Sequence, residues 1–281
     1  MNRVNDVSIR GLIKDATEVL GSDTARLDAE VLLASLLKKD RSYLLAWPEK
    51  ILPQKTREQF HQLVKRRASG EPVAYLTGQR EFWSLPLAVS TDTLIPRPET
   101  ETLVTLALEK IPPDGCLHIA DLGTGSGAIA LAIAHERPRC RVVATDASAK
   151  SLEIAADNAR NLGIENIHFI HGNWCDPLPQ EPFDLILSNP PYIEDQDPHL
   201  EHGDVRFEPR TALAAGPDGM DDLDHIVACA RQHLRKEGWL MLEHGYQQAD
   251  RVKMRLSEHG YREISSHSDE AGLDRVCMGR K

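Results

Sequence analysis

The feature that most constrains the fold is the alternation of apolar strands and amphipathic helices that begins at residue 117. Such alternation is typical of an α/β sheet with helices on both faces. The last two candidate strands are joined by residues 268–272, a link too short for a helical crossover, so they should pair antiparallel. We therefore expect a mostly parallel seven-stranded sheet with one antiparallel strand near the end. The expected strands are 117–122, 141–146, 167–171, 183–188, 238–244, 261–266 and 273–279, and the expected helices are 126–136, 148–162, 223–236 and 246–258.

The N-terminal part of the chain has a helical pattern instead. Ser8 can cap a first helix that Gly21 ends, with apolar residues along one face. Residues 25–37 are apolar on most sides, which indicates the buried helix of a small bundle. Thr56 can cap a third helix that runs to residue 70.

The pattern changes near residue 72. Residues 73–93 alternate apolar and polar side chains over much of their length, and Thr77 and Gly78 form a plausible hairpin turn. We interpret this stretch as a two-stranded linker between a helical domain, residues 1–72, and a main domain, residues 94–281. A further helix is expected over residues 99–110.

The net charge of −10 is unevenly distributed. Residues 1–72 carry 13 Lys and Arg against 10 Asp and Glu, whereas residues 73–281 carry 20 against 33. Because attraction to phosphate supplies most non-specific affinity for nucleic acid, the acidic main body is expected to bind duplex nucleic acid poorly.

Cysteine usage and hydropathy indicate the class of protein. The chain has no apolar stretch near the roughly 18 residues of a membrane span, and its first residues lack the apolar core of a secretion signal. The cysteines form no CxxC pair, which argues against a structural zinc site or a disulfide framework. We expect a cytoplasmic, monomeric protein that binds no metal and no membrane. The cysteines are Cys116, Cys140, Cys175, Cys229 and Cys277.

A glycine-rich loop, Asp-Leu-Gly-Thr-Gly-Ser-Gly at residues 121–127, lies between the first α/β strand and a helix. Its glycines permit a tight turn and let a ligand approach the backbone, and the helix N-terminus offers free N–H groups. Asp146 ends the next strand, where a carboxylate can accept both ribose hydroxyls of an adenosine. The loop also fits the dinucleotide pattern G-x-G-x-x-A, but Asp121 immediately before it favours S-adenosylmethionine.

Trp174 lies in residues 172–178, after the third strand of the expected sheet. A Trp at the C-terminal edge of such a sheet can pack on an adenine face. Ordinary core packing is an equally good interpretation of the same residue.

The tetrapeptide Asn-Pro-Pro-Tyr at residues 189–192 follows the fourth apolar strand, at the edge where α/β folds hold ligands. An amide nitrogen, or an amino group on an aromatic ring, is planar and a poor nucleophile. A site helps by accepting both of its hydrogens, and the Asn189 side chain and the Pro190 backbone each offer a carbonyl. The two prolines restrict the loop to extended conformations, and Tyr192 can lie flat against the planar group.

These residues occur within longer segments that resemble the release factor glutamine methyltransferases, the HemK/PrmC family. The resemblance covers nearly the whole chain. The Ser-Asn-Pro-Pro-Tyr segment alone is shared with adenine-amine methyltransferases of DNA and RNA. The matching segments are ARLDAEVLL (25–33), GEPVAYLTGQREFW (70–83), LIPRPETE (94–101), DLGTGSG (121–127), SNPPYI (188–193), DVRFEPRTAL (204–213) and LEHG (242–245).

The resemblance implies the fold, the reaction and its partners. It implies a Rossmann-like methyltransferase sheet beside a small helical domain that helps to dock the substrate protein. The implied reaction is methylation, by S-adenosylmethionine, of the glutamine in the Gly-Gly-Gln motif of class 1 translation release factors. The implied catalytic and substrate contacts are Asn189, Pro190, Pro191 and Tyr192. Together with Asp121, the expected cofactor contacts are Gly123, Thr124, Gly125, Ser126, Gly127, Asp146, Trp174 and Asn189.

Three alternatives remain at this point. An adenine-amine methyltransferase of DNA or RNA would use the same tetrapeptide, a nicotinamide-dependent oxidoreductase would use the glycine loop, and a binding module would use neither. Arg97 and Glu99 either shape a substrate entrance or begin a helix with a surface ion pair, and we slightly favour the second. Residues 207–209 are interpreted as part of a flap or as core packing, and His244 as a satisfied core histidine.

Overall fold

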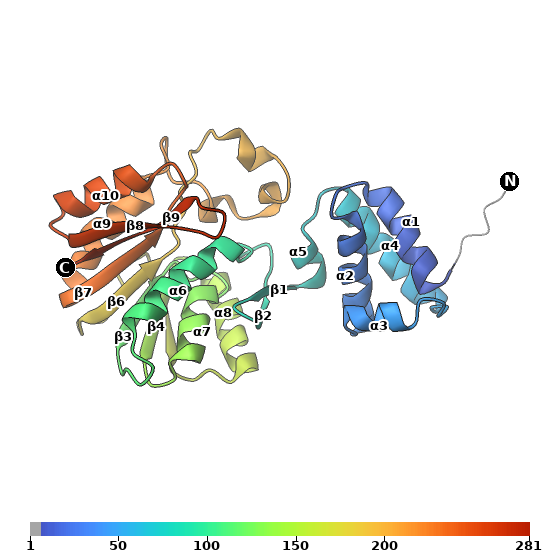
Figure 1. The fold of residues 1–281 in the computed structure, drawn as a ribbon, viewed down its shortest axis with the longest axis horizontal. Helices are drawn as coiled ribbons and strands as arrows, with labels where there is room; N and C mark the ends of the chain where they lie inside the picture. The colour runs from blue at the N-terminus through green and yellow to red at the C-terminus, as the bar shows by residue number, and fades with distance from the viewer. Residues whose placement is uncertain (1–6) are drawn as a thin grey trace. The chain divides into compact units, whose positions relative to one another are not determined.

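A computed structural model describes residues 7–281. By contacts the chain divides into two compact units, Met1–Gly78 and Gln79–Lys281, and each is described by itself (Figure 1). Within the described residues, no helix is both long enough and apolar enough to cross a lipid bilayer.

The first unit is a helical bundle, as its apolar pattern predicts. Ser8 caps the first helix by accepting a hydrogen bond from the Gly11 N–H at 3.2 Å, and Gly21 ends it in the left-handed conformation, φ 61°. The second helix has the predicted bounds, and the core gathers around the fully buried Leu32 and Phe60. The helices are α1 (Ile9–Leu20), α2 (Ala25–Leu37), α3 (Arg41–Ala46), α4 (Gln54–Ala68) and α5 (Val73–Thr77).

Two features of this unit differ from the prediction. Thr56 is not a cap, because α4 already begins at Gln54, directly after Pro53, whose ring holds φ at −55° and lets the chain enter the helix. Helix α3 was not predicted. Asp40 caps it by accepting the Tyr43 N–H at 2.9 Å.

The predicted hairpin exists, but the predicted position of its turn is wrong. Thr77 ends helix α5, and Gly78 caps that helix at φ 72°. Strands β1 (Gln79–Phe82) and β2 (Leu85–Ala88) pair antiparallel in the second unit. Trp83 and Ser84 turn the chain between them with φ of 53° and 58°, the left-handed values that a two-residue hairpin turn requires.

The second unit is built on a seven-stranded sheet with the order β5-β4-β3-β6-β7-β9-β8. Neighbouring strands run parallel except β9, which is antiparallel to both β7 and β8, so the predicted sheet is confirmed. The first four strands of the sheet in chain order match their predicted bounds to within a residue. The strands are β3 (His118–Leu122), β4 (Arg141–Asp146), β5 (Ile167–His171), β6 (Phe183–Ser188), β7 (Leu234–Glu243), β8 (Arg262–Ser268) and β9 (Asp274–Arg280).

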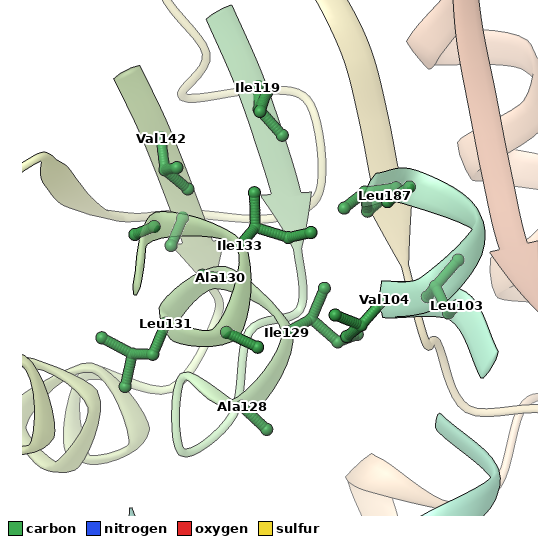
Figure 2. Close-up of a cluster of buried hydrophobic side chains, with 14 of the residues drawn as sticks. Leu103, Val104, Ile119, Ala128, Ile129, Ala130, Leu131, Ile133, Val142 and Leu187 are labelled. Atoms are coloured by element: carbon green, nitrogen blue, oxygen red, sulfur yellow. The ribbon is translucent and has the colours of Figure 1, made fainter. Parts of the chain in front are cut away.

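Helices cover both faces of this sheet (Figure 1). Side chains alternate along each strand, so Ile119 of β3 enters one apolar cluster and its neighbour Ala120 enters the other. The first cluster includes α6, α7 and the hairpin, and Figure 2 shows Ile119, Val142 and Leu187 beside the α7 side chains. The second cluster includes α9 and α10. The helices are η1 (Pro98–Thr100), α6 (Glu101–Lys110), α7 (Ala128–Glu136), α8 (Ala149–Leu162), η2 (Pro198–Glu201), η3 (Val205–Phe207), η4 (Arg210–Ala212), α9 (Asp221–His233) and α10 (Ala249–Glu258).

One buried side chain on α8 joins three parts of the second unit. The Asn158 oxygen accepts the Ala88 N–H at 2.7 Å, and its nitrogen donates to the carbonyls of Ala88 at 3.0 Å and Ser126 at 2.9 Å. Asn158 is 1% exposed, so water does not replace these bonds. It therefore fixes both the hairpin and the glycine loop to α8.

Replacing Asn158 with Ala should lower the free energy of unfolding by about 2–4 kcal/mol, because three hydrogen bonds are lost and their backbone partners stay buried. Denaturant unfolding of the whole chain measures this loss. Asn161→Ala is the matched control, since Asn161 lies on the same helix and is exposed. Equal stability of the two variants would contradict the assigned role.

Candidate active site

The glycine loop, residues 123–127, connects β3 to α7 and is held against the end of β4. The N–H groups of Gly123 and Thr124 both donate to the Thr145 carbonyl at 2.9 Å. The Gly125 N–H donates to the carboxylate of Asp146 at 2.8 Å. The loop and the predicted ribose-binding carboxylate therefore form one hydrogen-bonded structure.

The glycines of this loop are required for different reasons. Gly123, Gly125 and Gly127 all have positive φ, from 57° to 89°. A Cβ on Gly123 would lie 2.7 Å from the ring of Trp174, and one on Gly127 would lie 2.8 Å from Leu131. Among the described atoms, none outside the neighbouring residues lies within 4 Å of a Cβ built on Gly125. Gly123 thus permits the close approach of Trp174, while Gly125 meets only a backbone requirement.

Asp121 supports the loop from below. Its carboxylate accepts the Thr124 hydroxyl at 2.7 Å and the Ala130 N–H at 3.2 Å. Burial raises the pKa of Asp121 to about 7. Asp121 and Thr124, both predicted to contact the cofactor, thus bond to each other beneath the loop.

Asp146 faces outward at the end of β4. Its second oxygen accepts the Ser148 N–H at 2.8 Å, which also helps to start α8. Burial raises the pKa of this carboxyl, while the N–H groups of Ser148 and Gly125 oppose that rise. Two backbone donors thus fix the orientation of the carboxylate.

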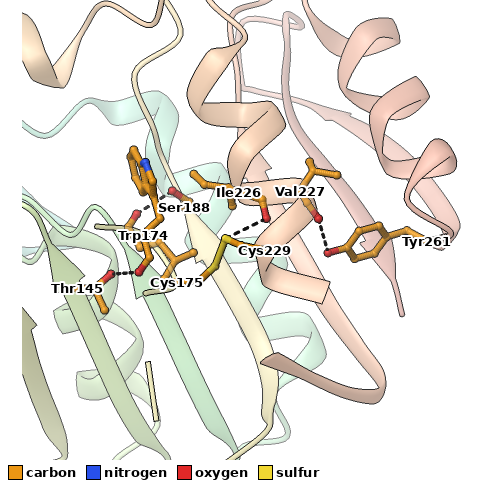
Figure 3. The surroundings of a disulfide bond; sticks show 9 residues. Thr145, Trp174, Cys175, Ser188, Ile226, Val227, Cys229 and Tyr261 are labelled. Carbon is orange, nitrogen blue, oxygen red and sulfur yellow. Dashed lines mark hydrogen bonds between the residues drawn. A yellow bond between two sulfur atoms is a disulfide. The ribbon is translucent and has the colours of Figure 1, made fainter. Parts of the chain in front are cut away.

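Trp174 lies over the glycine loop with a left-handed φ of 42°. Its carbonyl accepts the Thr145 hydroxyl at 3.0 Å (Figure 3), and its indole is hydrogen-bonded to Asp222. Trp174 packs against the apolar cluster of α9 and α10, as the core-packing interpretation expects, and it also lines a cavity.

The expectation of no disulfide is wrong. Cys175, next to Trp174, is bonded to Cys229 of α9 (Figure 3). The two cysteines are 54 residues apart in sequence, and only the folding of β6 and α9 beside the loop brings them together. No local spacing signals such a pair. The free cysteines among the described residues are Cys116, Cys140 and Cys277.

A cavity of about 550 Å³ opens between the glycine loop, the Trp174 loop and the tetrapeptide. The segments that line it are separate in sequence and meet at the carboxyl edge of the sheet. The predicted site residues that line it are Gly123, Gly125, Asp146, Trp174, Asn189 and Pro191; Asp121, Thr124, Ser126 and Gly127 do not line it.

The wall of this cavity carries carboxyl groups, one of which, that of Asp92, is already paired with Lys150 at 3.1 Å. Asp92, Asp146 and Asp222 contribute carboxyl groups. Of the described residues that line it, none is Lys or Arg. Such a wall favours a cationic ligand and disfavours a phosphate-bearing one.

The tetrapeptide that follows β6 is rigidly held. The N–H groups of Tyr192 and Ile193 both donate to the Leu213 carbonyl, at 3.2 and 2.9 Å. The Gln248 side chain donates to the Tyr192 carbonyl at 3.0 Å. Prolines and hydrogen bonds together fix the position of this loop.

A second, smaller cavity of about 150 Å³ lies along the tetrapeptide and is lined by Pro190 and Tyr192. Asn189 and Pro191 line both this cavity and the larger one. Asn189 therefore lies where the two cavities adjoin. A residue in this position can contact one ligand in the larger cavity and a second ligand in the smaller one.

The slightly favoured interpretation of Arg97 as part of a surface ion pair is wrong. Arg97 pairs with Glu208, whose side chain is fully buried, and Glu208 also accepts the Ile95 N–H at 3.1 Å. Burial raises the pKa of Glu208, and Arg97 opposes that rise. Arg97 also lines the smaller cavity, and its pair with Glu208 joins residues 94–100 to residues 204–213. Glu99 is exposed.

Two residues of the 242–245 segment, for which the sequence indicates no role in the site, lie close to the tetrapeptide or are buried. Glu243, at the end of β7, is 1% exposed, and burial raises its pKa to about 7. It accepts the Tyr192 hydroxyl at 3.4 Å. His244 is buried as predicted, with one ring nitrogen bonded to the Gly245 carbonyl, but its Nε2 lacks a partner among the described residues. Within residues 7–281, no group of three or more metal-ligating side chains converges.

Comparison with known proteins identifies similar sequences over the whole chain. Residues 12–78 match the family described as PrmC N-terminal domain, and residues 101–205 match the family described as Methyltransferase small domain. A release factor glutamine methyltransferase of Aliivibrio fischeri is 49% identical over 98% of each chain. One of Vibrio cholerae is 51% identical over 98% of this chain and 97% of its own. The solved structure of a methyltransferase from Pyrococcus furiosus shares the fold, with a TM-score of 0.55 and 18% identity over 77% of this chain and 96% of that chain.

Replacing Gly123 with Ala should destabilise the protein more than replacing Gly125 with Ala. Both variants strain a left-handed backbone, at a cost of about 1 kcal/mol, but only the first drives a methyl group into the Trp174 ring. We expect a loss of about 2–4 kcal/mol for Gly123→Ala. Denaturant unfolding without ligand measures both, and equal losses would show that the Trp174 ring moves aside freely.

Proposed function

The chain belongs to the family of release factor glutamine methyltransferases, and we propose that it methylates the glutamine side chain in the Gly-Gly-Gln motif of class 1 peptide chain release factors. The observation that carries this proposal is the position of Asn189, which lines both cavities. A methyl donor in the larger cavity and an amide in the smaller one would meet at this residue.

S-adenosylmethionine fits the chemistry of the larger cavity. Its positive sulfonium and amino groups suit a wall with three carboxyl groups, Asp92, Asp146 and Asp222. We assign its ribose hydroxyls to Asp146 and its adenine to Trp174. Bound in this way, it supplies a methyl group, and the rest of the molecule leaves as a neutral thioether. A dinucleotide would instead bring a pyrophosphate against the same carboxylates, which weighs against the oxidoreductase alternative.

The tetrapeptide would activate the acceptor by holding its hydrogens. The Asn189 side-chain oxygen and the Pro190 carbonyl accept the two amide hydrogens, so charge that develops on the nitrogen is stabilised. Tyr192 lines the smaller cavity, where it would lie along the planar amide. Because burial raises the pKa of the Tyr192 hydroxyl, it stays protonated and is not the base. The methylated cationic amide is acidic enough to release its proton without a strong base.

The helical unit would help to dock the release factor. Leu45 and Trp47, at the end of α3, and Ile51 just after it are 67%, 59% and 66% exposed. Apolar side chains grouped at this exposure are typical of a protein–protein contact.

Methyl transfer from isotope-labelled S-adenosylmethionine tests the function directly. The assay compares an intact class 1 release factor, the same factor with the glutamine of its Gly-Gly-Gln motif changed, and duplex DNA. Label on the intact factor alone supports the proposal. Label on DNA would support the adenine-amine alternative, and label on both forms of the factor would move the target to another residue.

Replacing Asn189 with Ala should lower kcat about 10²–10³-fold, since one of the acceptors of the amide hydrogens is lost. The Kd for S-adenosylmethionine, measured by calorimetry, should change little, because Asn189 is one of many residues that line the larger cavity. Full turnover by this variant would remove Asn189 from the mechanism.

Replacing Trp47 with Ala should raise KM for the release factor about tenfold and leave kcat unchanged, as expected for an aromatic contact residue. The rate with a short Gly-Gly-Gln peptide should not change. Val19→Ala is the control, because Val19 lies on α1 and is also exposed, at 62%. An equal effect of both variants, or an effect on the peptide, would contradict docking through residues 45–51.

A further inference from the structure

A buried hydroxyl that lines neither cavity contacts the side chain of Asn189. The Asn189 nitrogen Nδ2 donates to the Thr100 hydroxyl oxygen at 3.2 Å. Thr100, at the junction of η1 and α6, is 3% exposed, so water does not compete for this bond. The two residues are 89 positions apart in sequence.

The single hydrogen of the Thr100 hydroxyl is directed elsewhere. The carboxylate of Glu243 interacts with that hydroxyl, which lowers the pKa of Glu243, and an ionised carboxylate only accepts hydrogen bonds. The Thr100 oxygen therefore has lone pairs, and no hydrogen, to offer Asn189. If the Asn189 amide were reversed, its oxygen would face another acceptor, so only the orientation with Nδ2 toward Thr100 is favourable.

We propose that Thr100 and Glu243 are positioning residues that fix which end of the Asn189 amide faces the cavities. With Nδ2 held by Thr100, the oxygen Oδ1 is left for the ligand. This inference deepens the proposed function and rests on it in one respect, namely that Oδ1 is the end the acceptor needs. An amide held the other way would present a donor to the hydrogens of the substrate amide and repel them.

The cost of burying Glu243 supports this role. Its oxygen Oε2 has no hydrogen-bond partner among the described residues, and Tyr192 donates to the other oxygen at 3.4 Å. Burying a partly unpaired carboxyl is unfavourable, so a purely structural position would be better filled by a neutral side chain. A carboxylate is the group that ensures the Thr100 hydrogen points away from Asn189.

The ionisation of Glu243 should therefore affect the orientation of the Asn189 side-chain amide. Burial raises the pKa of Glu243 to about 7, with Glu99 adding to the rise, while Thr100, Arg275 and Tyr192 oppose it. Above pH 7 the carboxylate only accepts. Below pH 7 the protonated carboxyl can itself donate to Thr100, whose hydrogen is then free to hold the wrong end of Asn189. The orientation is thus best defined above neutral pH.

Paired substitutions at Thr100 test the role of the hydroxyl. Thr100→Val keeps the shape and removes the hydroxyl, and it should lower kcat about tenfold, the equivalent of one hydrogen bond, with KM and the Kd for S-adenosylmethionine nearly unchanged. Thr100→Ser keeps the hydroxyl and should retain most of kcat. If Val and Ser lower kcat equally, or if Val has no effect, the proposal is overturned. Thermal unfolding of both variants checks that neither result reflects loss of fold.

Glu243→Gln tests the ionised group. In the wild type kcat should fall as the pH is lowered from 8 to 6, because the carboxyl becomes protonated on passing its pKa of about 7. In Glu243→Gln this fall should be absent. A fall of the same size and midpoint in the variant would assign the titration to another group and remove Glu243 from the role.

A readout without turnover separates this inference from the proposed function. In protein labelled with ¹⁵N-asparagine, the Asn189 side-chain NH₂ signal is assigned by its loss in Asn189→Ala. One of its hydrogens should exchange slowly with water in the wild type and in Thr100→Ser, and rapidly in Thr100→Val. Rapid exchange in the wild type overturns the inference. Slow exchange, combined with no methyl transfer to the release factor, would leave the inference standing and reject only the proposed substrate.

Discussion

The site depends on the parallel pairing of β3 with the strands on either side of it. Leu122, the last residue of β3, pairs with Thr145 of β4 and with Ser188 of β6. The Ser188 hydroxyl also donates to the Leu122 carbonyl at 2.7 Å, inside the sheet. Because all three strands end at one level, the loops that follow them must meet there. This register places Asp146 and Asn189 on opposite sides of the glycine loop.

The parts of the fold that the sequence predicts well are those set by burial. Strands β4 and β6 have the predicted bounds, because strands covered on both faces of a parallel sheet appear as short apolar runs. The errors lie where single residues decide a turn. Gly78 ends a helix and does not form a hairpin turn, since a glycine with positive φ serves either structure equally well. The neighbours that decide between them are distant in sequence.

The residues of the site could be predicted from the sequence more readily than the contacts that hold those residues in position. Gly123, Asp146 and Asn189 are chemically distinctive and follow strands, so their convergence could be predicted. Contacts such as those of Asn189 with Thr100 and of Arg97 with Glu208 join residues 89 and 111 positions apart. No local pattern encodes such pairs. Asp121, which the sequence marks only as an acid beside the loop, lies buried beneath it and accepts the Thr124 hydroxyl.

The carboxyl groups in the wall of the larger cavity also have a consequence for turnover. In the proposed reaction the donor arrives as a sulfonium and remains as a neutral thioether after transfer. Asp146 and Asp222 line this cavity and would lie beside either species, but only the sulfonium carries the extra positive charge that they attract. The thioether product should therefore bind more weakly than the sulfonium donor, which favours replacement of the product by a new donor molecule. Such a wall would limit product inhibition through charge alone, with no conformational change required.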